Sequence, residues 1–418
     1  MRLIYALPIT YLAGLLLVSS PAHSAHSLDD NWEVTGFGTI GFAQTDKYQD
    51  RTLRRNVYQD SRKLRDDPFL TDSRFGLQVH GTISDHWEIT GQVIARYQIA
   101  RNPEDYIRFL FMRYRLDNEW QLALGRQPFD LFFLSDHRDV GYSYDWVRPP
   151  TELYGFIPYD SFDGIKVTKE WGTFDSAWSW NASIGNIKSK FESGATIEDE
   201  QNETTTAKPI YGTEINWQSD TWQIRANMAL LKFRQEIDSE ENLRQLMESI
   251  TPFWPDFKRV IGDFVKDTTL RYGAIGASWQ DNGWKIQTEF SILDADFVNF
   301  NGERAYFHVA HRFQNWLPFV TLGYAHDSNS HKYTPPPQGS GLDTLYEDVQ
   351  EEVISFRHNQ HSVSVGVRWD FARQKALKTQ CDRFFFKENS GSLHVRVDEK
   401  YRQNETKTWC SISFDWVF

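Results

Sequence analysis

Apolar and polar residues alternate along most of the chain in short segments. Between Trp87 and Tyr97 the odd-numbered positions are mainly apolar and the even-numbered ones mainly polar, and the alternation is cleaner still between Phe174 and Gly185. A period of two is typical of a β-strand with two different faces. Counting these segments predicts an all-β fold of about 16 strands. They lie near 32–45, 73–83, 86–98, 106–116, 119–127, 161–171, 174–186, 209–218, 221–232, 268–280, 283–294, 303–313, 316–327, 360–371, 375–386 and 408–418.

The connections between these segments are short and long in turn. The short connections include Asn282-Gly283, a strong hairpin signal, and the remaining connections are mostly long and polar. Short turns on one side and long loops on the other are typical of a transmembrane antiparallel β-barrel, with periplasmic turns and extracellular loops. The tight turns are Ser84-Asp85, Asp117-Asn118, Gly172-Thr173, Ser219-Asp220, Asp281-Asn282-Gly283, Gln314-Asn315 and Ala372-Arg373-Gln374.

Tryptophans support the barrel independently, because almost every tight turn has one within about two residues. Amphipathic aromatic rings prefer the depth of the lipid headgroups and form girdles there. In a soluble sandwich, the alternative for such strands, tryptophan would favour the centre of the core. The turn-flanking residues are Trp87, Trp120, Trp171, Trp217, Trp222, Trp279, Trp284, Trp316 and Trp369.

The two ends of the chain predict export and membrane insertion. Arg2, an apolar run from Leu3 to Val18 and small residues after it predict a cleaved signal peptide over 1–24, with an uncleaved anchor as the alternative. A single barrel domain would then span 25–418. The last strand alternates up to Phe418 and resembles the final strand of Gram-negative outer-membrane barrels, whose terminal aromatic residue is read by the insertion machinery.

Composition excludes several functions. The chain carries 57 acidic and 45 basic residues, a net charge of −12, which disfavours a nucleic-acid partner. Its mean hydropathy of −0.57 is too low for a bundle of apolar spans. We expect no cofactor, no metal site and no catalytic residues. The expected partners are outer-membrane lipid and lipopolysaccharide, the barrel-insertion machinery and small hydrophilic solutes.

With the apolar face toward lipid, the opposite face would line a lumen. A 16-stranded barrel is too wide for side chains to fill, so we expect water inside it. The wall carries charges of both signs, which favours mixed polar conduction over a dedicated anion site, and each residue is expected to be a solvated wall position. The predicted wall residues are Glu88, Arg96, Arg113, Arg115, Lys166, Arg225, Lys285, Glu289, Arg312, Arg368 and Lys378.

A long polar segment follows the fifth predicted strand, which closes on Gly125-Arg126. It includes the run Val-Gly-Tyr-Ser-Tyr-Asp-Trp-Val-Arg-Pro-Pro at 140–150. Here the chain resembles the Gram-negative general porins, in which a Gly-Arg pair closes the fifth strand and the third external loop folds into the barrel. The run also looks like one found in a group of marine gammaproteobacterial porins. The resemblance implies that loop 128–160 folds into the lumen, and an ordinary external lid is the alternative.

The resemblance also implies a constriction in which Arg126 on the wall faces aspartates of the loop. Opposed charges across a narrow gap create a transverse field that favours polar solutes. A homotrimer is typical of such porins, but the second loop that latches their subunits is here only Ile99–Asp105, which puts a latch in doubt. The implied constriction residues are Arg126, Asp130, Asp136, Asp139, Asp145 and Arg148.

Other connections carry weaker signals. In loop 233–267, Leu243, Leu246, Met247 and Ile250 are spaced as on one face of a helix, which predicts a short helix packed against other loops. Connections 187–208 and 328–359 are acidic or rich in Pro and Gly and are expected to be solvated loops.

Cys381 and Cys410 fall at about the same height on adjacent antiparallel strands, both on the apolar face. Directly opposite strand residues come close to the separation that a disulfide needs, and the periplasm oxidises such pairs. We predict a Cys381–Cys410 disulfide.

Three functions compete for a chain placed in the outer membrane. The first is a porin for passive diffusion of small hydrophilic solutes. The second is a binding or adhesion barrel that acts through its long loops. The third is a barrel enzyme: Ser135-Asp136-His137 has the residue types of a hydrolase, but catalytic triads meet in space and not by adjacency in sequence.

Overall fold

The computed structural model describes residues 26–29, 31–45, 51–57, 59–60, 63–64, 67–99, 102–157, 159–193, 201–234, 245, 248–260, 268–295, 301–327, 333–355, 357–388, 395–396 and 404–418. The predicted signal peptide lies outside the described residues, as do Leu243, Leu246 and Met247 of the predicted loop helix.

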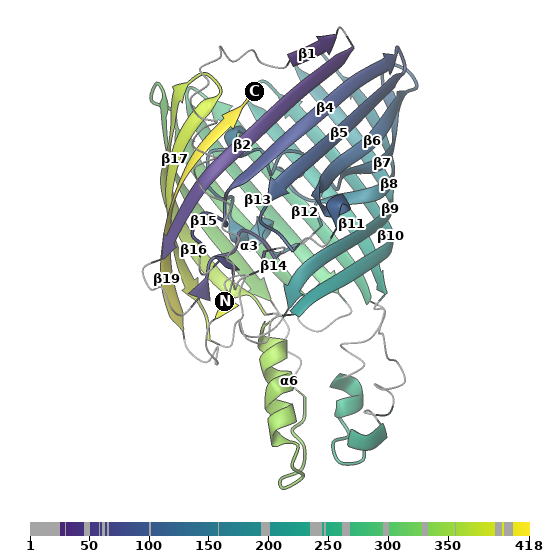
Figure 1. The fold of residues 1–418 in the computed structure, drawn as a ribbon, viewed down its shortest axis with the longest axis vertical. Helices are drawn as coiled ribbons and strands as arrows, with labels where there is room; N and C mark the ends of the chain where they lie inside the picture. The colour runs from purple at the N-terminus through teal and green to yellow at the C-terminus, as the bar shows by residue number, and fades with distance from the viewer. Residues whose placement is uncertain are drawn as a thin grey trace, which may run out of the picture.

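Antiparallel strands form one closed barrel, in which each strand pairs with the next and the last pairs with the first (Figure 1). Sixteen strands make up the wall. They are β2 (Trp32–Thr45), β4 (Arg74–Ser84), β5 (Trp87–Arg96), β6 (Ile107–Arg115), β7 (Trp120–Pro128), β8 (Ser161–Gly172), β9 (Ser176–Ser193), β10 (Gln201–Ser219), β11 (Trp222–Arg234), β12 (Thr268–Asp281), β13 (Trp284–Ala295), β14 (Gly302–His311), β15 (Trp316–Asp327), β16 (Asn359–Ala372), β17 (Lys375–Phe386) and β19 (Glu405–Val417).

Three short strands lie outside this wall count. Strand β1 (His26–Asp29) pairs with the beginning of β2, and β3 (Arg51–Thr52) pairs with β18 (Val395–Arg396) in a separate two-stranded sheet. The predicted all-β barrel is confirmed, and the predicted segments coincide with the wall strands to within a few residues at most boundaries.

One predicted loop is wrong in extent. The chain at 187–208 was expected to be a polar loop, but β9 continues to Ser193 and β10 begins at Gln201. Their ladder runs without a break from Ile187 opposite Ala207 to Ser193 opposite Gln201. Threonines 204–206 favour strands and pair across the ladder, so the hairpin extends beyond the level at which the apolar pattern ends.

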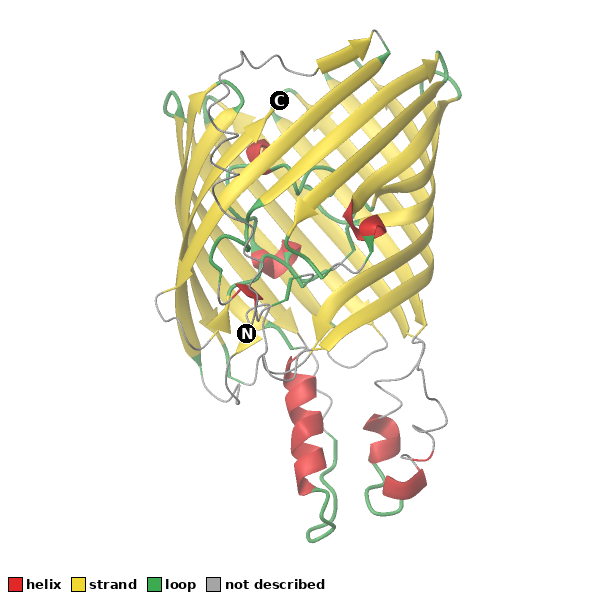
Figure 2. Cartoon of the chain, viewed as in Figure 1, coloured by secondary structure: helices red, strands yellow, loops and turns green. Residues whose placement is uncertain are grey.

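The two ends of the barrel differ, as Figure 2 shows. At the end that we call the turn end, adjacent strands are joined by the tight turns, and indole rings pair beside them: Trp316 and Trp369 stack with centroids 5.0 Å apart. Asn282 and Gly283 adopt positive φ values of 48° and 80°, as the tight hairpin between β12 and β13 requires. The long connections gather at the opposite end, the loop end.

The outward side chains are apolar and exposed, which is the face that lipid would cover. Leu124 on β7 and Met228 on β11 are 61% and 68% exposed. Among the described residues, none of the helices combines the length and the apolar character that crossing a bilayer requires.

Two connections at the loop end pack together into a small lobe beyond the barrel rim. Trp254 and Phe257, between β11 and β12, are buried against Tyr333, which precedes helix α6 (Asp343–Ser355). The Trp254 indole donates a hydrogen bond to the carbonyl of Thr334, 2.7 Å away. Ile250 of the predicted loop helix packs on this cluster, whereas the sequence analysis did not predict α6. We call these residues the loop-end lobe.

Cys381 on β17 and Cys410 on β19 lie directly opposite one another and form a disulfide. Their Cα atoms are 4.1 Å apart. Both side chains share the outward face with Ile412, so the bond ties the last two strands together on the lipid side.

The seam that closes the barrel lies between β19 and β2. The backbones of Gly36 and Phe418 exchange two hydrogen bonds, of 2.8 and 2.9 Å. The Phe418 ring lies over Gly36 and the Trp416 indole over Gly38, where a Cβ atom would fall within the space of each ring. Glycine at these two positions therefore lets the terminal aromatic residues lie flat across the seam.

Candidate pore constriction

The third loop, residues 129–160 between β7 and β8, lies inside the barrel (Figures 1 and 2). It contains a turn of 3-10 helix, η2 (Gly141–Ser143), and one turn of α-helix, α3 (Thr151–Tyr154). Its side chains and backbone contact inward-facing residues of strands on every side of the barrel. Inward partners of the third loop include Arg74, Arg96, Arg108, Lys166, Arg225, Asn227, Tyr272, Glu289, His308, Thr321, Gln360, Arg368, Lys378, Gln380 and Ser411.

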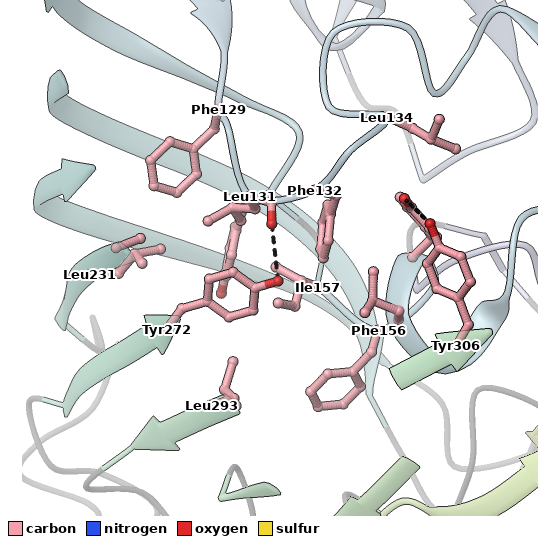
Figure 3. Close-up of a cluster of buried hydrophobic side chains, with 14 of the residues drawn as sticks. Phe129, Leu131, Phe132, Leu134, Phe156, Ile157, Leu231, Tyr272, Leu293 and Tyr306 are labelled. Carbon is pink, nitrogen blue, oxygen red and sulfur yellow. Dashed lines mark hydrogen bonds between the residues drawn. The ribbon is translucent and has the colours of Figure 1, made fainter. Parts of the chain in front are cut away.

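An apolar core forms between the first part of this loop and the wall. Phe129, Leu131 and Phe132 pack with Tyr272 and with small or aliphatic inward residues of β9 to β13 (Figure 3). The Tyr272 hydroxyl donates a hydrogen bond to the carbonyl of Leu131 at 3.0 Å. We expected water throughout the lumen, and this expectation is wrong here: the loop supplies the apolar surface that the wall alone could not bring together.

On the β14 to β19 side the loop packs closely against the wall. Lys378 was predicted to be a solvated wall residue, but it is fully buried and donates hydrogen bonds to the carbonyls of Gly141 (2.6 Å) and Trp146 (2.9 Å). Arg368 likewise donates to the carbonyl of Tyr142 at 2.7 Å. These two cations hold loop backbone, because buried carbonyls of a turned segment need hydrogen-bond donors that a regular helix or strand would supply.

Glu289 was also predicted to line open water and is also buried. Its carboxylate accepts hydrogen bonds from the backbone N–H of Phe133 at 2.9 Å and from the Tyr154 hydroxyl at 2.5 Å. It therefore anchors two distant points of the loop to β13. The physical reason for these corrections is the same: wall residues that carry unpaired charge are the ones best able to satisfy a polar loop.

Arg148 of the predicted constriction lies in this closely packed region. Its Nη2 contacts Asp72 at 2.5 Å and its Nη1 contacts Asp382 on β17 at 3.4 Å. Both carboxylates and the guanidinium are buried. Arg148 thus joins the loop to the connection just before β4 and to β17, and it is buried.

Five charged residues form a buried ion lattice where the loop meets β5 and β6. Asp139 contacts Arg96 (2.6 Å) and Arg108 (3.1 Å). Asp160 contacts Arg96 (3.2 Å), Arg108 (3.0 Å) and Arg138 (2.5 Å). Burial alone would raise the pKa of Asp139, but the facing arginines outweigh it and hold the pKa well below its usual range. With three cations and two anions, the lattice carries one excess positive charge.

Asp145 sits on the other side of the loop. It contacts Lys285 on β13 at 2.8 Å and the Nε2 of His308 on β14 at 3.1 Å. Burial raises the pKa of Asp145, but the charge of Lys285 and the hydrogen bond with His308 outweigh that effect and keep the pKa below its usual range. Asp145 is therefore an anchor to the wall.

Open, polar surface remains along β5 to β9 toward the turn end. There Arg113 and Arg115 both contact Glu88, and the Arg113 side chain is 38% exposed. Lys166 on β8 contacts Asp130 of the loop at 2.6 Å, and Asp136 at the loop tip is exposed. This side differs from the β14 to β19 side, where inward residues such as Ser413 are covered by the loop.

The remaining predicted wall residues also lie at the turn end. Arg225 on β11 lies 3.8 Å from Asp136 and 3.4 Å from Glu214. Arg312, just after β14, is exposed and contacts Asp370 at 2.8 Å. These pairs place charges of both signs at the turn end of the barrel. The wall residues predicted from the sequence also carry both signs.

Arg126 does not face the loop aspartates, and this expectation is wrong. It makes a bidentate ion pair with Asp163 on β8, with N–O distances of 2.8 and 3.0 Å. The physical reason is strand parity: Arg126 has the same parity as Leu122 and Leu124, which face outward. The wall arginines that pair with loop aspartates are instead Arg96 and Arg225, which were predicted, and Arg108, which was not.

The residues that the sequence analysis missed are Arg74, Arg108, Arg138 and Asp160. Arg74 shares the inward parity of Gly76 and Gln78, so strand parity alone could have nominated it as a wall position. Arg108 has the parity of Leu110 and Met112, which face outward, and it meets the loop only because a register shift interrupts the β5–β6 ladder at this residue. Asp160 directly precedes β8, and its role depends on a fold-back that no local pattern encodes.

Solved structures with a similar fold include outer-membrane proteins. OmpF of Salmonella typhi, in complex with daunomycin, matches with a TM-score of 0.52 at 9% identity, covering 94% of this chain and all of its own. An anion-selective porin from Comamonas acidovorans matches with a TM-score of 0.51 at 11% identity over 93% of this chain and all of its own. The outer membrane channel DcaP of Acinetobacter baumannii matches with a TM-score of 0.50 at 10% identity over 95% of this chain and all of its own.

No protein-family model and no curated sequence matches the chain. At about a tenth identity, the likeness to solved structures concerns architecture and leaves the solute open. The chain has the fold of the 16-stranded outer-membrane porins.

Proposed function

We propose that the chain is a porin through which small hydrophilic solutes diffuse passively across the outer membrane. The turn end would face the periplasm and the loop end the outside, after removal of residues 1–24. The observation that carries the proposal is the asymmetry of the interior: the third loop covers the β14 to β19 wall, while polar inward side chains such as Arg113 and Thr168 stay partly accessible in the turn-end part of β5 to β9.

The passage in this proposal runs between the third loop and the β5 to β9 wall. On the turn-end side it is bordered by Glu88, Lys166 and Asp136, which carry both signs of charge. On the loop-end side it meets the ion lattice around Arg96 and Asp139. Charges held on both sides of a narrow, partly dehydrated gap favour hydrated polar solutes and disfavour apolar ones.

The test is single-channel recording in a planar bilayer of neutral lipid. We expect step-like currents of one main amplitude from the folded protein, and none from the same preparation after heat unfolding. The reversal potential in a salt gradient then reports the charge preference. Folded protein that inserts and stays electrically silent would contradict the proposal.

A binding barrel that acts through its loops is the second candidate. The loop-end lobe favours it, because Trp254, Phe257 and Tyr333 build a separate apolar core beyond the rim. Protein that inserts into the bilayer but conducts no current would favour the binding barrel over the porin. A homotrimer is compatible with either function, and its stoichiometry can be read from the same purified material by light scattering.

A further inference from the structure

A cavity of about 460 Å³ lies at the loop end, where the barrel wall is lowest. Strands β5, β6 and β7 have 10, 9 and 9 residues, while β9 and β10 have 18 and 19, so the long hairpin stands above its neighbours. The turn of 3-10 helix η1 (Pro103–Tyr106) lies at the same rim and contributes to the cavity lining. The cavity lies against the loop-end side of the ion lattice, since Arg96, Arg108 and Asp160 line it.

Basic side chains enter the lining from five strands. They are Arg96, Arg108, Arg126, Lys188 and Lys208, against the acidic Glu104, Asp105, Asp160 and Asp163. Three of the four acids are already engaged: Asp163 by Arg126, Asp160 by three arginines of the lattice, and Asp105 by the backbone N–H of Asn102. Lys188 and Lys208 are exposed residues of the lining.

Arg108 has an unmet hydrogen-bond donor at this cavity. Its Nε contacts Asp139 and its Nη1 contacts Asp160, but its buried Nη2 has no hydrogen-bond partner. The side chain is only 6% exposed. A buried cationic donor without a partner is costly, and an anionic oxygen is the partner that stabilises it best.

We propose that this cavity binds an oxyanion, a carboxylate or phosphate group, with Arg108 Nη2 as the buried donor and Lys188 and Lys208 as outer charges. The inference rests on the proposed function, because the cavity then forms the outer entrance of the passage. The oxyanion belongs to a solute in transit or to a lipid headgroup at the rim. In both cases the bound group offers oxygen acceptors to a site that holds one excess cation.

The direct test uses inorganic phosphate on channels in a neutral bilayer. Phosphate added on the loop-end side is expected to reduce the chloride current with saturation. In Arg108→Gln the half-saturating concentration should rise about tenfold or more, the effect of losing one charge-assisted hydrogen bond. Because Arg108→Gln also disturbs the lattice, Lys188→Gln combined with Lys208→Gln gives a second variant at exposed positions, with an expected rise of roughly threefold. Lys232→Gln, exposed at the loop end but outside the cavity, is the matched control and should behave as wild type.

A second measurement keeps the inference separate from conduction. Phosphate should raise the unfolding temperature of the detergent-folded wild type and of Lys232→Gln, but much less that of Arg108→Gln, because a ligand that binds only the folded state stabilises it. Silent channels with this pattern would overturn the proposed function and keep the site. Conducting channels with no saturable phosphate effect and no thermal shift would overturn the site.

The lipid arm separates the two sources of oxyanion. With lipid A in the leaflet at the loop end, a site taken by headgroup phosphate should no longer respond to added phosphate. A response that persists with lipid A present assigns the site to mobile solutes.

Discussion

Asp139→Asn combined with Asp160→Asn is expected to release the third loop from the β5 and β6 wall. The double change leaves Arg96, Arg108 and Arg138 close together without their carboxylates, in a region where all five side chains are mostly buried. Removing one partner of a buried ion pair costs on the order of 3–5 kcal/mol, because the remaining charge is left without compensation. Three arginines that repel one another add to that cost.

Two readouts should change together in this variant. The single-channel current should rise, on the order of twofold, and fluctuate more, since a loop that leaves the wall widens the gap. The temperature at which the folded band disappears on a gel should fall. A barrel that keeps wild-type current amplitude and noise would contradict the role given to the lattice.

The matched control is Asp294→Asn. Asp294 also pairs with an arginine, Arg271, at 3.1 Å, but both side chains are more than half exposed. Exposed pairs contribute about 0–1 kcal/mol, so current and stability should stay at the wild-type values.

Gly38→Val is expected to impair closure of the barrel. A Cβ atom at this position would fall within the Trp416 indole ring, on the seam where β19 pairs with β2. Overpacking of this kind costs about 1–3 kcal/mol, and here it acts on the pairing that joins the two ends of the sheet. Trp416 can leave the seam only by exposing Gly38 and the neighbouring backbone.

The measurement is the fraction of protein that reaches the heat-resistant folded form after refolding, together with its unfolding temperature. Both should fall in Gly38→Val. Gly273→Ala on β12 is the control, because a Cβ atom there would meet no atom closer than 4.0 Å. Equal folding yields for the two variants would show that the seam does not limit closure.

The wall of the barrel could be predicted from the sequence because its signal is local. Alternation within each strand, turn residues such as Asn282-Gly283 and turn-flanking tryptophans each depend on neighbours a few residues apart. Cys381 could be placed by counting from the turn at Arg373, and Cys410 by counting back from Phe418, for the same reason. The extension of β9 and β10 was not predicted, because its residues are mostly polar on both faces and show no alternation.

The interior of the barrel could not be predicted in the same way. Lys378 meets the carbonyl of Gly141, 237 positions away, and Tyr154 meets Glu289, 135 positions away. Such contacts depend on how the third loop lies across the lumen, which no periodicity specifies. The sequence pattern of a charged inward residue is the same whether its side chain faces water or a loop. For this reason the pattern predicted that Lys378, Arg368 and Glu289 would face water.

Solutes are proposed to pass between the third loop and the β5 to β9 wall. The most direct test places a cysteine on each side of the interior, because the native cysteines are bonded to each other. Ser183→Cys lies on β9, half-buried and opposite Lys166, while Ser413→Cys lies on β19 beneath the loop at 1% exposure. A negatively charged methanethiosulfonate reagent applied during recording should lower the current through Ser183→Cys channels and leave Ser413→Cys channels unchanged. Loss of current in Ser413→Cys, with none in Ser183→Cys, would contradict the account.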